Sequence, residues 1–259
     1  MMIQDIQSEK DLRNVIIEKV GVKNIKYPIL VSDRIKGSQQ TTAEIDIYVD
    51  LDAQNRGTHM SRFIEVLNRF HQETFIDNLP DFLAQIKEEL QAERAYTAIK
   101  FTYFMMKKAP VSQKESLMSY QCSFEAYLKE EYKLKLKVTV PVTSLCPCSK
   151  KISKYGAHNQ RSEVTVSVFY EDHVWLEELI EMVEETASCE IYSLLKRADE
   201  KYVTEKAYEN PKFVEDVVRD LTLKLRADKR ITSFIVESEN FESIHNHNAY
   251  ACVAEERNK

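Results

Sequence analysis

Apolar and polar residues alternate most regularly between Thr41 and Leu51. Every second residue from Ala43 onward is apolar, and the residues between them are Glu, Asp and Tyr. An extended chain places successive side chains on opposite faces, so this pattern predicts a half-buried strand. Two later segments, Ala95–Met106 and Leu117–Leu128, are rich in Tyr, Phe and Thr and predict further strands.

The hydrophobic period changes to that of a helix after Ser61 and again after Pro80. In both segments the apolar residues recur three or four positions apart and therefore share one helix face. The start of the chain predicts a short helix near Asp11–Val20, followed by an apolar segment, Ile25–Val31. The two buried helix faces are predicted to consist of Phe63, Val66, Leu67 and Phe70, and of Phe82, Leu83, Ile86 and Leu90.

The second half of the chain repeats this order of elements. Its longest predicted helix covers about His173–Lys196, with apolar residues spaced for one face. A further helix is predicted to start at Asn210, because asparagine is a good N-cap and Pro211 suits the first helical position. The buried face of that helix is predicted to hold Val214, Val217 or Val218, Leu221 and Leu225. The predicted strands are Leu134–Leu145, Glu163–Tyr170, Ile231–Ser238 and Asn248–Ala254.

Each half therefore has the order strand, strand, helix, helix, strand, strand, although no residue-level repeat accompanies it. Paired antiparallel strands around paired helices predict an α+β protein, with sheet on one side and helices on the other. We predict two such modules in tandem, over residues 1–130 and 131–259. The alternative is one irregular α+β domain, which hydrophobic periodicity alone leaves open.

Composition and charge exclude several classes of protein. The 259 residues are 43% hydrophobic and 30% charged, which is typical of a globular protein. A net charge of −6 gives no reason to expect a nucleic-acid partner. The sequence contains no apolar run near the length of a membrane span and no secretory signal at its N-terminus. Five irregularly spaced cysteines predict reduced thiols in the cytoplasm rather than a disulfide framework.

The four glycines form neither of the glycine-rich loops that bind nucleotide phosphates. If the chain binds a nucleotide, side chains and the ends of helices or strands must therefore hold it.

The polar segment Thr143–Ser162 carries the strongest chemical signal. It places Cys146 and Cys148 directly after a predicted strand and His158 just before the next strand. A thiolate and an imidazole on one loop suit a transition-metal site or a thiol active site. The alternative is structural, because two free cysteines are as often small buried residues and a lone histidine is more often structural than a ligand.

Four further residues are candidates only in combination. Glu200 lies just beyond the long predicted helix, and Glu215 lies beside the apolar face of the last one. His245 and His247 would share a face in an extended segment. Each of these residues alone is more readily explained as part of a solvated surface, since isolated helix carboxylates are usually exposed.

Together, Cys146, His158, Glu200 and His245 offer one sulfur, two nitrogens and one carboxylate. Structural zinc sites usually take closely spaced Cys and His pairs, whereas a dispersed mixed set suits a catalytic site with an open position for water.

Several long motifs resemble those of the type IB GTP cyclohydrolase I family. They are H-M-S-R-F from His59, T-S-L-C-P-C-S-K from Thr143, G-A-H-N-Q-R-S from Gly156, L-K-R-A-D-E-K-Y-V-T-E-K-A-Y-E-N-P-K-F-V-E-D from Leu195, and E-S-I-H-N-H-N-A-Y-A from Glu242. They occur in the family's order and span most of the chain. The resemblance is weakest over about 72–130, where no motif of the family occurs.

The resemblance implies a tunnelling fold with two modules in each chain, assembled as a tetramer with active sites at subunit interfaces. It also implies conversion of GTP to 7,8-dihydroneopterin triphosphate and formate, the entry step to tetrahydrofolate and, in many bacteria, to queuosine. Cys146, His158, Glu200 and His245 would surround one divalent metal ion, with Glu242 close by. The mixed ligand set accepts zinc, manganese or iron.

The resemblance further implies that Glu215 anchors guanine, whose N1–H and 2-amino groups are two adjacent donors for one carboxylate. His158 or His245 would transfer protons. The cationic candidates for the triphosphate are Arg62, Lys150, Lys151, Arg161, Lys196 and Arg197.

Two alternative functions remain at this stage. One is the nitrile reductase of the queuosine pathway, which has the same fold but uses a cysteine nucleophile and NADPH. A sulfur nucleophile needs no metal, so the accompanying His158, Glu200 and His245 argue against it. The other is a non-catalytic scaffold that binds a metal or a nucleotide.

Overall fold

The computed structural model of the chain describes residues 7, 9–70 and 76–257. The chain divides into two compact units, one of Met1–Thr102 with Ser123–Lys135 and the other of Tyr103–Cys122 with Leu136–Lys259. The predicted module boundary between residues 130 and 131 stays a prediction. Of the helices in the described part, none is long and apolar enough to cross a membrane.

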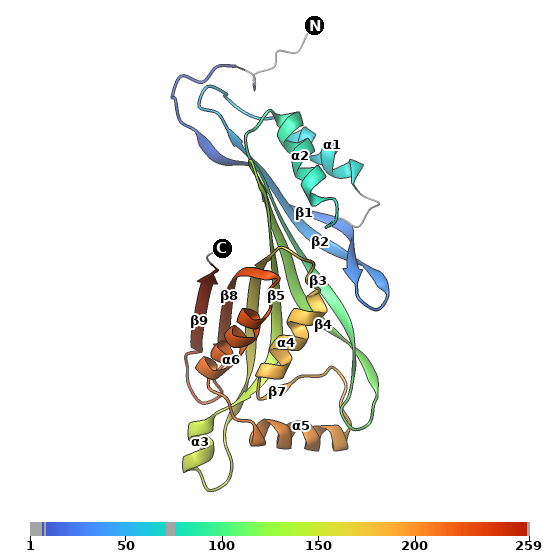
Figure 1. The fold of residues 1–259 in the computed structure, drawn as a ribbon, viewed down its shortest axis with the longest axis vertical. Helices are drawn as coiled ribbons and strands as arrows, with labels where there is room; N and C mark the ends of the chain where they lie inside the picture. The colour runs from blue at the N-terminus through green and yellow to red at the C-terminus, as the bar shows by residue number, and fades with distance from the viewer. Residues whose placement is uncertain (1–6, 8, 71–75, 258–259) are drawn as a thin grey trace. The chain divides into compact units, whose positions relative to one another are not determined.

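The described strands form an antiparallel β-sheet combined with helices, which confirms the predicted α+β class. Hydrogen-bonded neighbours follow the order β1-β2-β3-β4-β5-β6-β8-β9, and the short β7 pairs with β5. The elements of the first half, in chain order, are β1 (Ile17–Asp33), β2 (Gly37–Leu51), α1 (Met60–Arg69), α2 (Leu79–Leu90), β3 (Ala95–Lys108) and β4 (Glu115–Leu128). These elements are coloured blue to green in Figure 1.

The first unit confirms the alternating strand and the two helical faces except at Leu90, which is only partly buried. The apolar residues of β2 from Ala43 to Leu51 are buried, and so are Phe63 and Leu67 of α1 and Phe82 of α2. Helices α1 and α2 pack against each other and contact β1 and β2. The unit thus buries one face of the sheet under two helices, which is the arrangement expected of apolar stripes on both elements.

The predicted helix near Asp11–Val20 is wrong, because β1 begins at Ile17 and the residues before it are not helical. Gly21 shows why the segment is a strand. A Cβ atom at this position would lie 2.0 Å from the carbonyl oxygen of Ile47, so only glycine permits this close approach of β1 to β2. Long-range strand pairing, which local spacing does not reveal, decides the conformation here.

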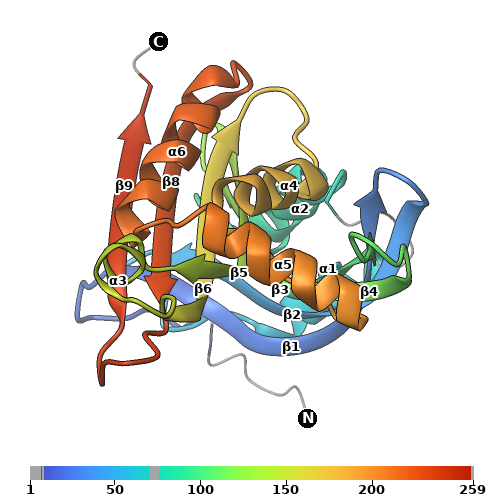
Figure 2. The same ribbon diagram turned by 90° about the horizontal axis from the view of Figure 1, so that it is seen from below.

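The second half contains the four predicted strands and helices at both predicted helical segments, with three additions at Pro147–Ile152, Cys189–Glu190 and Arg197–Glu209. In chain order they are β5 (Tyr132–Leu145), α3 (Pro147–Ile152), β6 (Asn159–Tyr170), α4 (Leu176–Thr186), β7 (Cys189–Glu190), α5 (Arg197–Glu209), α6 (Val214–Ala227), β8 (Ile231–Asn240) and β9 (Ala249–Glu256). Helix α6 contacts α4 and packs against β8 and β9 (Figure 2). Its predicted apolar face is buried throughout.

The long helix predicted over His173–Lys196 is wrong, since α4 ends at Thr186. The next residues return to the sheet, where Cys189 pairs with Thr143 and Glu190 with Val142. Glu190 then accepts hydrogen bonds from Lys206 Nζ and Tyr192 Oη, each across 2.6 Å. The bond from Lys206, sixteen residues further along the chain, stabilises a break in the helix that the continuing apolar spacing does not reveal.

Helix α6 begins at Val214 and not at Asn210 as predicted. The Asn210 side chain donates instead to the carbonyl oxygens of Ala187 and Ser188, at 2.9 and 3.3 Å. A carboxylate three residues into the helix replaces the expected cap, because Asp216 accepts the backbone N–H of Phe213 across 3.0 Å.

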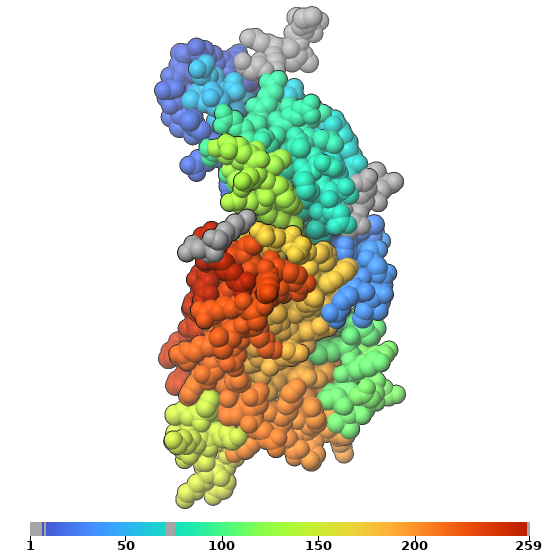
Figure 3. Space-filling view, viewed as in Figure 1, coloured from blue at the N-terminus to red at the C-terminus, as the bar shows by residue number. Residues whose placement is uncertain are grey.

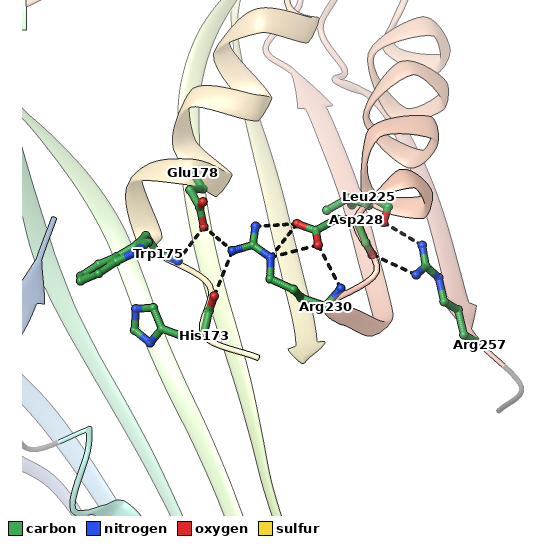
Figure 4. A network of polar contacts seen from close by, with 7 residues as sticks. All are labelled: His173, Trp175, Glu178, Leu225, Asp228, Arg230 and Arg257. Atoms are coloured by element: carbon green, nitrogen blue, oxygen red, sulfur yellow. Dashed lines mark hydrogen bonds and ion pairs between the residues drawn. The ribbon is translucent and has the colours of Figure 1, made fainter. Parts of the chain in front are cut away.

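A guanidinium network connects α4 to β8 in the second unit (Figure 4). Arg230 contacts the carboxylates of Asp228 and Glu178 at 2.7 and 3.0 Å and the carbonyl oxygen of His173 at 3.0 Å. Asp228 and Glu178 raise the pKa of Arg230 above its ordinary value, mainly through the Asp228 hydrogen bond. Arg257 donates to the carbonyl oxygens of Leu225 and Asp228, so the ends of α6 and β9 are connected as well.

Candidate active site

Cys146 and His158 lie on one compact turn between β5 and β6. The backbone N–H of Cys146 donates to the carbonyl oxygen of His158 across 3.1 Å. The backbone N–H of His158 donates in turn to Ser149 Oγ at 3.1 Å, and Cys146 Sγ accepts the Ser149 N–H at 3.3 Å. The sequence predicted a polar connection here, and the structure adds the six-residue helix α3 within it. Figure 3 shows this turn as yellow-green atoms beside the orange α5.

The imidazole of His158 faces two oxygen atoms through Nδ1. Gln160 Oε1 lies 3.0 Å from Nδ1, and Glu242 Oε2 lies 3.8 Å from it. The side chains of His158 and Glu242 are only 15% and 11% exposed. Glu242 therefore lies beside His158, and its expected position close to a metal ion stays a prediction.

Behind Gln160 a row of buried polar groups crosses the sheet. Gln160 Nε2 donates to Ser144 Oγ at 2.9 Å, Ser144 Oγ is 2.8 Å from Ser162 Oγ, and Ser162 Oγ donates to Asn240 Oδ1 at 2.6 Å. All four side chains are buried. Sequence reasoning missed them, although a signal existed: Ser144 and Ser162 occupy inward positions of otherwise apolar alternating strands.

Glu200 lies in the first turn of α5 and is exposed. Its neighbour Asp199 is fully buried and holds this end of the helix. The Asp199 carboxylate accepts the backbone N–H groups of Val111, Ser112 and Lys196, each at 2.8 Å, and the Ser112 hydroxyl at 2.6 Å. Burial alone would raise the pKa of Asp199, but these hydrogen bonds outweigh it and hold the pKa below its ordinary range.

His245 and His247 lie in a bend between β8 and β9, not in an extended segment, and both are exposed. Their rings nevertheless stack, with centroids 5.1 Å apart and planes inclined by 15°. The two imidazoles therefore share one side of the bend, as the spacing predicted, three residues beyond Glu242.

Within one chain, the described side chains of His, Cys, Asp and Glu include no group of three or more that could hold a metal ion. Cys146 and His158 share a turn and Glu242 adjoins them, but Glu200 and His245 do not complete a cluster with that pair. The four-ligand set accordingly stays a prediction.

The predicted guanine anchor, Glu215, is exposed in the first turn of α6. That end of the helix adjoins the Cys146 turn, because the backbone N–H of Lys212 donates to the carbonyl oxygen of Leu145 across 3.1 Å. The first turn of α6 is therefore tied to the residue that directly precedes Cys146.

The predicted triphosphate cations differ in their availability. Lys150 Nζ donates to the carbonyl oxygen of Tyr208 and lies 4.4 Å from the centre of its ring. Arg62, in the first unit, donates to the carbonyl oxygen of Glu89 at 2.7 Å. The exposed cations are Lys151, Arg161, Lys196 and Arg197. These four exposed side chains are thus better placed to bind an anion than those of Lys150 or Arg62.

The comparisons with known proteins agree with the motifs. Residues 3–251 match the family described as type I GTP cyclohydrolase folE2. A curated protein of Magnetococcus marinus named GTP cyclohydrolase FolE2 is 58% identical over 97% of this chain and 95% of its own length. Proteins of the same name from Geotalea uraniireducens and Thermosipho africanus are 56% and 55% identical, and cover 99% and 97% of this chain and 94% and 97% of their own lengths.

Several solved structures that resemble the chain are uricases. Uricase from Arthrobacter globiformis superposes with a TM-score of 0.52 at 8% identity, covering 93% of both chains. A highly active mutant of urate oxidase from Bacillus sp. TB-90 gives 0.55 at 8% identity, covering 93% of this chain and all of that one. Identity this low bears on the fold alone, which is the tunnelling fold. The match over nearly the whole sequence shows that this chain belongs to the type I GTP cyclohydrolase FolE2 family.

Proposed function

We propose that this protein converts GTP and water to 7,8-dihydroneopterin triphosphate and formate, the first step of folate and queuosine precursor synthesis. The observation that carries the proposal is the turn that joins Cys146 to His158, with Glu242 beside the imidazole, in a chain of this family. The names of the curated relatives favour a cyclohydrolase over a nitrile reductase or a non-catalytic scaffold.

The donor atoms at the turn suit a divalent cation. Cys146 offers a partly exposed sulfur, and His158 offers Nε2, since Nδ1 already faces Gln160 and Glu242. Glu200 and His245 are the proposed further ligands. A zinc, manganese or iron ion held there would supply the Lewis acidity that makes water nucleophilic near neutral pH. Attack at C8 of guanine then opens the imidazole ring, and a second hydrolysis releases C8 as formate.

We assign base recognition to Glu215. Its carboxylate can accept both guanine donors, N1–H and the 2-amino group, in a charged bidentate arrangement. Adenine lacks this donor pair, so one side chain suffices to select the base. The connection of the first turn of α6 to the Cys146 turn supports the assignment, since a guanine held by Glu215 must place its C8 near Cys146 and His158.

Proton transfer falls to the histidines. Both nitrogens of His158 have a role in this scheme, because Nδ1 faces oxygen atoms of the protein and Nε2 is a ligand. The imidazole of His245 is exposed, so its ring nitrogen that does not bind the metal ion is the one we assign to proton transfer during ring opening and closure of the pterin. The exposed Lys151, Arg161, Lys196 and Arg197 are the first choice for the triphosphate.

We further propose a homotetramer with active sites between subunits. Strands β1 and β9 are the terminal strands of the sheet order among the described elements, and such edges pair readily with another chain. A site shared between copies also explains why the proposed ligands form no cluster in one chain. A cytoplasmic setting suits the five cysteines, which are all free thiols in the structure.

The test is direct. Purified protein is incubated with GTP and, separately, with Mn²⁺, Zn²⁺ or Fe²⁺ after removal of bound metal. Formate is quantified, and the pterin is detected by its fluorescence after oxidation. Cys146→Ala should abolish both products, while Cys148→Ala, two residues away and exposed, should retain them. Formation of neither product with any of the three metals would refute the proposal.

A further inference from the structure

The buried row of Asn240, Ser162, Ser144 and Gln160 ends at the imidazole of His158, and its hydrogen bonds have a direction. Asn240 Oδ1 is a carbonyl oxygen and can only accept, so the single hydroxyl proton of Ser162 points toward it. Ser162 Oγ must then accept from Ser144 at 2.8 Å, which commits the hydroxyl proton of Ser144 as well.

The same direction continues to the histidine. With its proton committed, Ser144 Oγ can only accept from its other neighbour, so it receives the Gln160 Nε2–H across 2.9 Å. The Gln160 amide is thereby oriented with Oε1 toward His158 Nδ1, 3.0 Å away. A carbonyl oxygen cannot donate, so Nδ1 must carry the proton.

Glu242 favours the same proton position independently. Its Oε2 lies 3.8 Å from Nδ1, and both side chains are largely shielded from solvent. A carboxylate near Nδ1 favours a proton on that nitrogen. The row fixes the orientation of the Gln160 amide, and the negative charge of Glu242 adds an electrostatic preference for a proton on His158 Nδ1.

We infer that Asn240, Ser162, Ser144 and Gln160 are positioning residues that fix the Nδ1–H tautomer of His158 and keep its Nε2 lone pair available to a ligand. Nε2 is the atom that the proposed function assigns to the metal, so the consequence for metal affinity rests on that proposal. The consequence for the tautomer does not, because it follows from the hydrogen bonds of the metal-free chain.

A simpler explanation is that the serine pair only connects β5 to β6. The chain offers a matched control for it, since Thr139 Oγ1 and Thr165 Oγ1 form a hydroxyl pair at 2.9 Å between the same two strands. That pair is not part of the row of hydrogen bonds that ends at His158. If the serine pair were only structural, Ser144→Ala and Thr139→Val would have similar effects.

The tautomer is read by magic-angle-spinning NMR of metal-free protein labelled with ¹⁵N-histidine, at a pH where the imidazole is neutral. The His158 signal is assigned by its loss in His158→Gln. The parent and Thr139→Val should show Nδ1–H at His158. Ser144→Ala should show an added fraction of the Nε2–H form, because the Gln160 amide can then turn, while Glu242 still favours Nδ1–H. Ser144→Ala with Gln160→Glu should restore Nδ1–H, since an ionised carboxylate only accepts.

The second measurement is the affinity for Mn²⁺ or Zn²⁺ by competition with a chelator. Ser144→Ala should weaken it about 10- to 100-fold, the usual effect of losing a group that orients a metal ligand, and the double variant should recover it. An Nε2–H tautomer in the parent would overturn the inference, as would tautomer populations in Ser144→Ala that equal those of the parent. If the tautomers behave as stated but the parent binds no metal, the inference stands and the proposed function fails.

Discussion

The backbone N–H of Cys146 is hydrogen-bonded to the carbonyl oxygen of His158 across 3.1 Å, although twelve residues separate them. This bond closes the polar loop on itself, so the thiol and the imidazole come from one rigid turn at the end of β5. The sulfur of Cys146 and the imidazole of His158 are thus held together before any metal or substrate binds. This lowers the conformational entropy that is lost on binding.

Both side chains of this turn should be needed for metal retention. We expect Cys146→Ala and His158→Ala to weaken metal binding by more than about 100-fold, since losing a direct ligand exceeds the effect of losing a supporting group. Metal content after gel filtration, measured by mass spectrometry, checks this. Cys148→Ala is the control in the same turn. A chelated protein that keeps full activity would contradict the metal-dependent mechanism.

Glu215→Gln should reduce kcat/KM for GTP at least tens of fold. The amide keeps one acceptor but turns an NH₂ toward a guanine donor, and a charged hydrogen bond contributes about 1.5–3 kcal/mol. Fold and metal content should not change, because Glu215 is exposed and is not a proposed ligand. The exposed helix residue Glu65 supplies the control, as Glu65→Gln should leave turnover unaltered. Turnover by Glu215→Gln within twofold of the parent would remove the assignment.

Glu190→Gln should lower stability at neutral pH and have less effect in acid. Burial alone would raise the pKa of Glu190, but hydrogen bonds from Lys206 and Tyr192 outweigh it and lower the pKa from 4.5 to about 2. Because the pKa of Glu190 is lower in the folded than in the unfolded protein, its carboxylate stabilises the fold at pH values above the unfolded-state pKa. This stabilisation is lost as the pH falls through the folded-state pKa.

The expected loss for Glu190→Gln at pH 7 is on the order of 2 kcal/mol, after discounting for the partly exposed Lys206 ammonium. Urea unfolding of parent and variant from pH 7 downward measures it. The difference should shrink below pH 4.5, the ordinary pKa of the group. A difference that stays constant throughout the acid range would show that the carboxylate charge is not responsible.

The active protein should sediment as a tetramer. The terminal strands β1 and β9 each leave one edge available for pairing, and a shared site would need ligands from more than one copy. Analytical ultracentrifugation at the concentration of the activity assay decides this. Activity that persists in a monomeric fraction would exclude sites between subunits.

Iodoacetamide should react with the exposed Cys148 much faster than with the buried Cys122 and Cys189. Burial raises the pKa of Cys189 to about 12 and that of Cys122 beyond the ordinary range, so neither forms thiolate near neutral pH. Cys148 is exposed and should be alkylated within minutes. Peptide mass spectrometry should find Cys122 and Cys189 modified only after denaturation. Their rapid modification in native protein would indicate that this part of the second unit opens readily.

Local pattern predicted those parts of the fold in which burial follows a simple period. The alternation of β2 and the apolar face of α6 were predicted residue by residue. The break after Thr186 was missed because Ala187, Ile191 and Leu195 continue the helical spacing. The interactions that end the helix, above all Glu190 with Lys206, join residues far apart in sequence, which no periodicity reports.

The candidate site also contains residues that the sequence predicted and residues that it did not. The motifs pointed to Cys146 and His158, and the structure joins these two residues in one turn. Gln160 and Asn240 were missed, because a single buried amide has no sequence signature and its role depends on a hydrogen-bonding partner across the sheet. Ligands that come from more than one copy of a chain would leave no trace in the spacing of one sequence.

The hydrogen bonds of Asp199 make the turn between β3 and β4 a poor site for an insertion. Hairpin tips are normally the first choice for a tag, a label or an inserted domain. Here the backbone of Val111 and Ser112 is bound to the carboxylate that also caps α5, directly before Glu200. An insertion at this tip would release the first turn of α5 and displace Glu200, a proposed metal ligand in that same turn.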